Sequence, residues 1–209
     1  MSERRSRRGI RSSRRIATCY HEAGHCLARW YFGHSFDRVL VPATDEVQRG
    51  AQTASGGEEA APETLARAHC GTVAGAEQEL VHCYAGIMVE ARYCGVHVGA
   101  AMLAAADDDM ARAQAVLREW FPDDDAREAA ALLAESRAVA LARSKPGWAA
   151  ITAMADALLE RGELSWEEAE PLFATAYGHK QPHIGAWHDA WPPSLDMIRA
   201  GQTPGIEAL

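Results

Sequence analysis

The sequence predicts a mainly α protein with a small β element, and two observations support this prediction. Only one stretch, FDRVLVPAT at residues 36–44, alternates as a strand does before a proline ends it. Apolar residues recur at helical spacing elsewhere, over residues 16–32, 75–93, 110–121, 124–143 and 146–161. A chain of 209 residues that is 48% hydrophobic can bury a core of this kind.

The first helix, expected over residues 16–32, has an unusual centre. The stretch TCYHEAGHCLARW holds two histidines and a glycine, and neither residue type is a strong helix former. Gly33 is a suitable stop for this helix. A strand within 36–44 follows, and a second strand is expected at 47–53, ahead of a loop rich in glycine, serine and alanine. The β element is therefore expected directly after the histidine-bearing helix.

Helices are expected to fill most of the second half of the chain. The stretch AEQELVHCYAGIMVEARY is the clearest part of the helix at 75–93. Three acidic residues precede the helix at 110–121 and suit its positive N-terminal end. SKPG separates the helices at 124–143 and 146–161, and its proline suits the first turn of the second one.

The chain is expected to divide into a leader, a domain and a tail. Residues 1–14 form a basic leader that is expected to be disordered. The domain covers residues 15–176 and ends in a helix that Ser165 and Glu168 begin with a capping box. Residues 177–209 form a C-terminal tail rich in proline, glycine and tryptophan.

Charge and composition exclude some classes of partner. The net charge is −8, although residues 1–15 hold seven arginines and one acidic residue, so the rest of the chain is strongly acidic. An acidic body argues against nucleic acid as the main partner. No run of 18 or more apolar residues occurs, so no membrane span is expected. Five cysteines without a CxxC pair favour reduced thiols and a cytoplasmic location.

The HEAGH motif carries the chemistry that the sequence predicts. His21 and His25 are four residues apart, so on a helix they lie on one face about one turn apart. Two imidazoles placed in this way can bind one tetrahedral metal ion, most often zinc. Glu22 is then a candidate general base for a water whose pKa the metal lowers. Ala23 and Gly24 are small, which allows another element to approach this helix closely.

A catalytic zinc ion needs a third protein ligand and an open position for water. The pattern HExxHxxGxxH would place glycine at 28 and histidine at 31, but the chain has Ala28 and Tyr31. The residues alone leave open a glutamate in the turn-like stretch that follows, a glutamate of a later helix, or an aspartate of the DDD run. These candidates are Glu46, Glu90, Asp107, Asp108 and Asp109.

Four segments of the chain together resemble a known family. They are YHEAGHCLARWYF, FDRVLVPAT, YAGIMVEARY and GAAMLAAADDDMARAQ, and their order resembles that in the peptidase domain of FtsH-type ATP-dependent zinc proteases. The stretch GWAAITAMADALLERGELSWEEAEPLF is similar to the helical pair at the end of that domain. The resemblance covers roughly residues 15–176 and implies an FtsH-peptidase-like helical fold around the HExxH helix.

The resemblance implies roles for particular residues. Aligning the family's NDLxxAT segment with DDMARAQ makes Asp109 the third zinc ligand, and Glu90 then supports the site without binding the ion. The strand around 39–41 resembles one that pairs with an extended substrate backbone. The chain has no GxxxxGK[ST] phosphate loop, so cleavage is expected without ATP. The family's hexameric ring leaves a homo-oligomer or a separate partner protein open here.

The expected function is that of a zinc-dependent metalloendopeptidase that hydrolyses peptides or unfolded proteins. His21, His25 and Asp109 are expected to hold Zn²⁺, and Glu22 is expected to activate the attacking water. The alternative is a non-catalytic, peptidase-like protein that binds a client or a regulatory partner. The intact HEAGH motif argues against this alternative, whereas the missing ATPase favours it somewhat.

Overall fold

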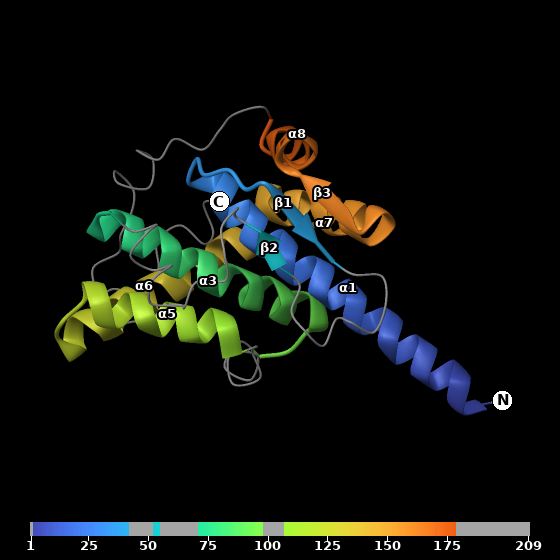
Figure 1. Ribbon diagram of the computed structural model, residues 1–209, viewed down its shortest axis with the longest axis horizontal. Coiled ribbons are helices and arrows are strands. Elements are labelled where there is room, and N and C mark those ends of the chain that lie inside the picture. The colour runs from blue at the N-terminus through green and yellow to red at the C-terminus, as the bar shows by residue number, and fades with distance from the viewer. Residues whose placement is uncertain (1, 42–51, 55–70, 98–106, 179–209) are drawn as a thin grey trace.

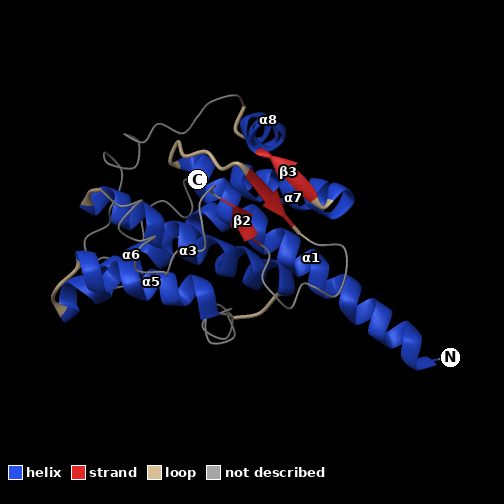
Figure 2. Cartoon of the chain, viewed as in Figure 1, coloured by secondary structure: helices blue, strands red, loops and turns tan. Residues whose placement is uncertain are grey.

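The computed structural model describes residues 2–41, 52–54, 71–97 and 107–178 (Figure 1). Six helices and three short strands lie in these ranges, and Figure 2 shows how far the helices predominate. The prediction of a mainly α protein with a small β element is therefore confirmed. The elements are α1 (Ser2–Tyr31), β1 (Arg38–Leu40), β2 (Gln52–Ala54), α3 (Val73–Cys94), α5 (Asp107–Trp120), α6 (Asp124–Arg143), α7 (Lys145–Arg161), β3 (Glu163–Ser165) and α8 (Trp166–Ala176).

The helix α1 differs from its prediction at the N-terminal end. It begins at Ser2 and not at residue 16, so it includes the basic leader that was predicted to be disordered. Arginine is a good helix former and no proline interrupts the segment, so the local sequence is compatible with a helical backbone. The predicted tail from residue 179 onward and the cysteine Cys70 lie outside the described residues.

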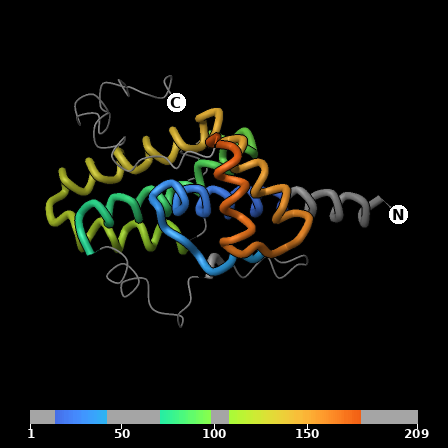
Figure 3. The backbone as a smooth tube through the Cα atoms, turned by 90° about the horizontal axis from the view of Figure 1, so that it is seen from above, coloured from blue at the N-terminus to red at the C-terminus, as the bar shows by residue number. Residues whose placement is uncertain are grey.

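The helix α1 packs against both α3 and α7, and Figure 3 shows it running through the middle of the molecule. Its large apolar side chains Leu27 and Trp30 are buried, and the rings of Trp30 and Phe173 lie 5.8 Å apart between α1 and α8. A Cβ atom added to Gly24 would lie 2.7 Å from the carbonyl oxygen of Ala85 and 3.0 Å from Cγ2 of Val89. The expectation that small residues in HEAGH permit a close approach is therefore confirmed, and α3 is the element that approaches.

The sheet has the antiparallel order β2-β1-β3, so β1 is its central strand. Val39 is paired with Thr53 on one side and with Leu164 on the other. Both edges of β1 are therefore occupied by the chain itself, and the expectation that this strand pairs with substrate is wrong. The sequence also failed to predict β3, because a three-residue strand contains too little alternation to be recognised.

Caps fix the helices that carry and support the site. The Thr72 hydroxyl accepts a hydrogen bond from the Gly75 amide at 3.0 Å, and Gly95 ends α3 with φ at 65°. The backbone N–H of Ser165 donates to Glu168 Oε2 at 2.9 Å, which confirms the capping box that begins α8. The two ends of α3 are therefore fixed in place along α1.

Within the ranges that the structure describes, no helix combines the length and apolar character needed to cross a lipid bilayer. Four cysteines in these ranges are free: Cys19, Cys26 and Cys83 are buried and Cys94 is exposed. The buried thiols pack in the helical core and take part in no disulfide bond.

We predict that Gly24→Ala destabilises the protein. The new methyl group meets the α3 backbone, and this overlap outweighs the roughly 1 kcal/mol that alanine gains over glycine inside a helix. The expected loss in the free energy of unfolding is about 1–2 kcal/mol, measured by urea denaturation. Gly71→Ala is the control, because no atom lies within 4 Å of the added Cβ there. Equal or greater stability of Gly24→Ala would contradict the close contact.

Candidate metal centre

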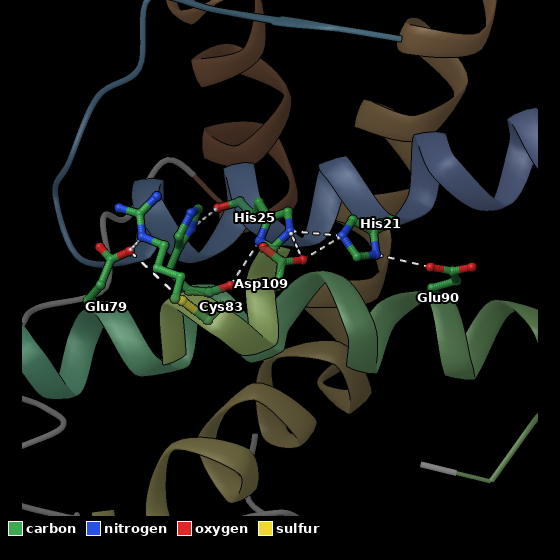
Figure 4. A network of polar contacts seen from close by, with 8 residues as sticks. His21, His25, Glu79, Cys83, Glu90 and Asp109 are labelled. Atoms are coloured by element: carbon green, nitrogen blue, oxygen red, sulfur yellow. Dashed lines mark hydrogen bonds and ion pairs between the residues drawn. The ribbon is translucent and has the colours of Figure 1, made fainter. Parts of the chain in front are cut away.

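Three side chains from α1 and α5 meet against α3 (Figure 4). His21 Nε2 lies 3.0 Å from Asp109 Oδ2, and His25 Nε2 lies 3.1 Å from the same oxygen. The two Nε2 atoms are 3.0 Å apart. A helical spacing of four residues places the two imidazoles on one face of α1, and the first turn of α5 brings the carboxylate to them. These three are the residues for which the sequence analysis predicted metal binding.

Hydrogen bonds on the far side of each imidazole determine which nitrogen faces the cluster. His25 Nδ1 lies 2.8 Å from the carbonyl oxygen of His82, which can only accept, so this nitrogen carries the proton. His21 Nδ1 lies 3.0 Å from Glu90 Oε2, and a carboxylate also accepts. When both rings are neutral, each Nε2 therefore points a lone pair toward Asp109. This arrangement of outer partners is the one that orients histidines bound to a metal.

The electrostatics of the cluster favour a positive charge at its centre. Burial lowers the pKa of His21, but hydrogen bonds to Asp109 and Glu90 outweigh it and raise the pKa to about 10. Burial raises the pKa of Asp109, but the charges and hydrogen bonds of His25 and His21 hold it well below its usual range. Without a metal ion, the cluster thus retains a proton on an imidazole beside an ionised carboxylate. A cation that replaces this proton can be held by the same three atoms.

Gly86 of α3 makes room for the two imidazoles. A Cβ atom at this position would lie 2.5 Å from His25 Nε2 and 2.7 Å from His21 Nε2. Any side chain would therefore displace the ring nitrogens that converge on Asp109. The sequence analysis missed this residue, although a glycine in the interior of the apolar helix segment YAGIMVEA is costly and was a usable signal.

The other predicted residues lie around the three ligands. Glu22 follows His21 on α1, is only 5% exposed, and its charge contributes to raising the pKa of His21. The cluster of converging ligand atoms does not include Glu22. Glu90 bonds to the outer nitrogen of His21 and does not join the cluster. Asp108 is exposed, and Glu46 lies outside the described residues.

The chain matches no family model and no curated protein.

We predict that Asp109→Asn lowers the pKa of His21 in protein freed of metal by a chelator. The amide removes a negative charge that stabilises the imidazolium, so that the pKa falls from about 10 by about 1–3. Glu90→Gln is expected to lower it too, because the second hydrogen-bonding carboxylate is lost. The measurement is a pH titration of the His21 ring protons by NMR. Glu163→Gln, an exposed change on β3, is the control, and an unmoved His21 titration in Asp109→Asn would contradict this electrostatic picture.

Proposed function

We propose that the protein is a zinc metallopeptidase in which His21, His25 and Asp109 hold the ion. The observation that supports this proposal is the convergence of three ligand atoms, in which the outer hydrogen bonds of the two imidazoles leave each Nε2 lone pair facing Asp109. Three lone pairs at this separation repel one another unless a proton or a metal cation lies between them. Two imidazole nitrogens and one carboxylate oxygen are a donor set that suits zinc.

The spacing of the ligand atoms also suits zinc. Bonds of about 2.0–2.1 Å to a tetrahedral ion place neighbouring ligand atoms about 3.3 Å apart. The separations here are 3.0, 3.0 and 3.1 Å, so a small outward shift of the side chains accommodates an ion. Three protein ligands leave the fourth tetrahedral position for solvent or substrate, as in catalytic zinc sites.

The protein's own groups then carry the hydrolysis. Zinc, when bound, supplies Lewis-acid chemistry that polarises a carbonyl and lowers the pKa of water. Glu22 accepts a proton from the water that attacks the carbonyl carbon. The carbon–nitrogen bond breaks, and Glu22 gives the proton to the departing amine. Glu90 and the carbonyl of His82 keep both imidazoles in the tautomer that this chemistry requires.

The substrate class rests on the resemblance to the FtsH-type peptidase domain, and we propose it on that basis. Four segments of the sequence follow the family's order, and the third ligand that the resemblance implies is the aspartate that meets the two histidines. We therefore propose cleavage of peptides or unfolded proteins without ATP, in the cytoplasm. The free, buried thiols are consistent with that compartment.

We predict that Asp109→Ala loses bound zinc. Even the loss of a residue that only supports a ligand weakens zinc affinity about 10- to 100-fold, so loss of a ligand is expected to exceed that range. Metal content after dialysis and affinity by chelator competition are the measurements. Asp108→Ala is the matched control, since Asp108 is the exposed neighbour on the same helix. Unchanged zinc content in Asp109→Ala would remove Asp109 from the site and make Glu90 the leading candidate.

We predict that Glu22→Gln retains zinc and loses peptidase activity. The amide cannot accept the proton of the attacking water, so cleavage of casein falls about 100- to 10,000-fold. Glu160→Gln, an exposed change on α7, serves as the control and keeps full activity.

The same assay separates the enzyme from its non-catalytic alternative. A zinc-loaded wild-type protein that leaves casein and peptide libraries intact, with and without chelator, would favour a protein that only binds its client. Loss of zinc from Glu22→Gln would instead contradict the role given to Glu22.

A further inference from the structure

A cavity of about 50 Å³ lies between α1 and the N-terminal part of α3, beside the metal centre. Its mouth is formed by residues that are exposed or half-buried: His34, Gly75 and Gln78. His34 Nε2 lies 3.0 Å from Gln78 Oε1 at this mouth. The floor is formed by three buried side chains, a basic one, an acidic one and an imidazole: Arg29, Glu79 and His82.

Arg29 contributes a buried N–H donor to the lining of the cavity. It is 8% exposed, and its Nε atom has no hydrogen-bond partner in the part of the chain that the structure describes. A buried guanidinium is costly to leave without an acceptor, and it prefers a carboxylate that it can bind through two nitrogens. The Nε–H group of Arg29 is therefore a hydrogen-bond donor that a ligand in the cavity could satisfy.

The other groups of the floor do not neutralise Arg29. The carboxylate of Glu79 is engaged elsewhere, since Glu79 Oε1 lies 2.6 Å from Arg112 Nε. Glu79 Oε1 also lies 4.0 Å from the thiol of Cys83. Glu79 is the one carboxylate among the described residues that line the cavity, and its ion pair with Arg112 leaves Arg29 without one.

His82 is the wall that the cavity shares with the metal centre. Its ring lies 4.7 Å from the ring of His25, and its carbonyl oxygen holds His25 Nδ1. Arg29 follows His25 by four residues, so it lies about 6 Å further along the same face of α1. That separation is close to the distance between residues i and i+2 of an extended peptide.

The volume limits what the cavity can admit. A cavity must offer roughly 10–15 Å³ before it can hold a single water, so this one, at about 50 Å³, admits only a small group. A carboxylate with its methylene carbon has that size. We propose that the cavity is a specificity subsite that binds a carboxylate of the substrate close to the scissile bond, with Arg29 as its recognition residue. That the carboxylate belongs to a peptide substrate rests on the proposed peptidase function. That the cavity binds a carboxylate at all rests on the cavity alone.

The ligand can be tested without catalysis, on chelator-treated protein. The probe is N-acetylglutamic acid α-amide, compared with N-acetylglutaminamide, which differs only in lacking the side-chain carboxylate. We expect saturable NMR shifts of the His82 ring protons with the acid and none with the amide. N-acetylglycine beside N-acetylglycinamide distinguishes a chain-terminal carboxylate from an acidic side chain. Absence of saturable binding by both acids would overturn the proposal, whatever the protein cleaves.

The selectivity is tested with the zinc-loaded full chain and peptides that carry Glu or Gln at each position flanking the scissile bond. We expect one position at which Glu raises kcat/KM about 10- to 100-fold over Gln, mostly through KM, as a charged hydrogen bond would. In Arg29→Gln the Glu-to-Gln ratio falls toward one, and in Arg29→Lys part of the ratio returns. Arg38→Gln, on the exposed side of β1, leaves the ratio unchanged.

These outcomes separate the two proposals. A merely structural Arg29 would lower kcat/KM equally for Glu and Gln peptides, and this result overturns the subsite. If Arg29→Gln does not fold, the wild-type titration and Arg29→Lys still decide the matter. Carboxylate binding without any peptide cleavage would support the subsite and contradict the peptidase function. Cleavage with no preference for a carboxylate at any position would support the peptidase function and contradict the subsite.

Discussion

The close contact between α1 and α3 is the constraint on which the rest of the site depends. Gly24 lets the two backbones approach, and Gly86 clears the space that the imidazoles then occupy. Only at this distance can His82 offer its backbone carbonyl to His25 while Glu90 reaches His21 from the same helix. The two glycines weaken their helices locally, and the tertiary packing offsets that cost.

The register of this helix pair is as specific as its distance. Along α1 from N- to C-terminus, His21 contacts Glu90 of α3, and His25 then contacts Gly86 and the carbonyl of His82. The partners on α3 thus come in reverse chain order, so the two helices run antiparallel. Contacts at intervals of about four residues on both helices are typical of ridges that pack into grooves. A slide by one turn, about 5.4 Å, would break every one of these contacts together. The contacts between α1 and α3 therefore fix the tautomer of each histidine without a contribution from Asp109.

The sequence revealed the helices and the pairing of His21 with His25 because both depend on local spacing. It could rank Asp109 above Asp108 only through a resemblance, since the residues alone do not say which aspartate faces inward from the first turn of α5. The central position of β1 and the roles of Gly86 and Arg29 were missed, because they arise from contacts between distant segments. The early start of α1 was missed because a helix of arginines and serines shows no apolar periodicity.

The same helix face explains why the metal centre and the cavity lie next to each other. His21, His25 and Arg29 follow one another at intervals of four residues, so that α1 presents two imidazoles and then a guanidinium in one line. The ring of His82 lines the cavity together with Arg29 and lies 4.7 Å from the ring of His25, and burial, followed by the charge of Arg29, lowers the pKa of His82. The backbone carbonyl of His82 binds His25 Nδ1, while the side chains of His82 and Arg29 line the cavity. A single helix therefore presents two imidazoles to the candidate metal site and, one turn later, a guanidinium to the cavity, which is the arrangement that the two proposals require.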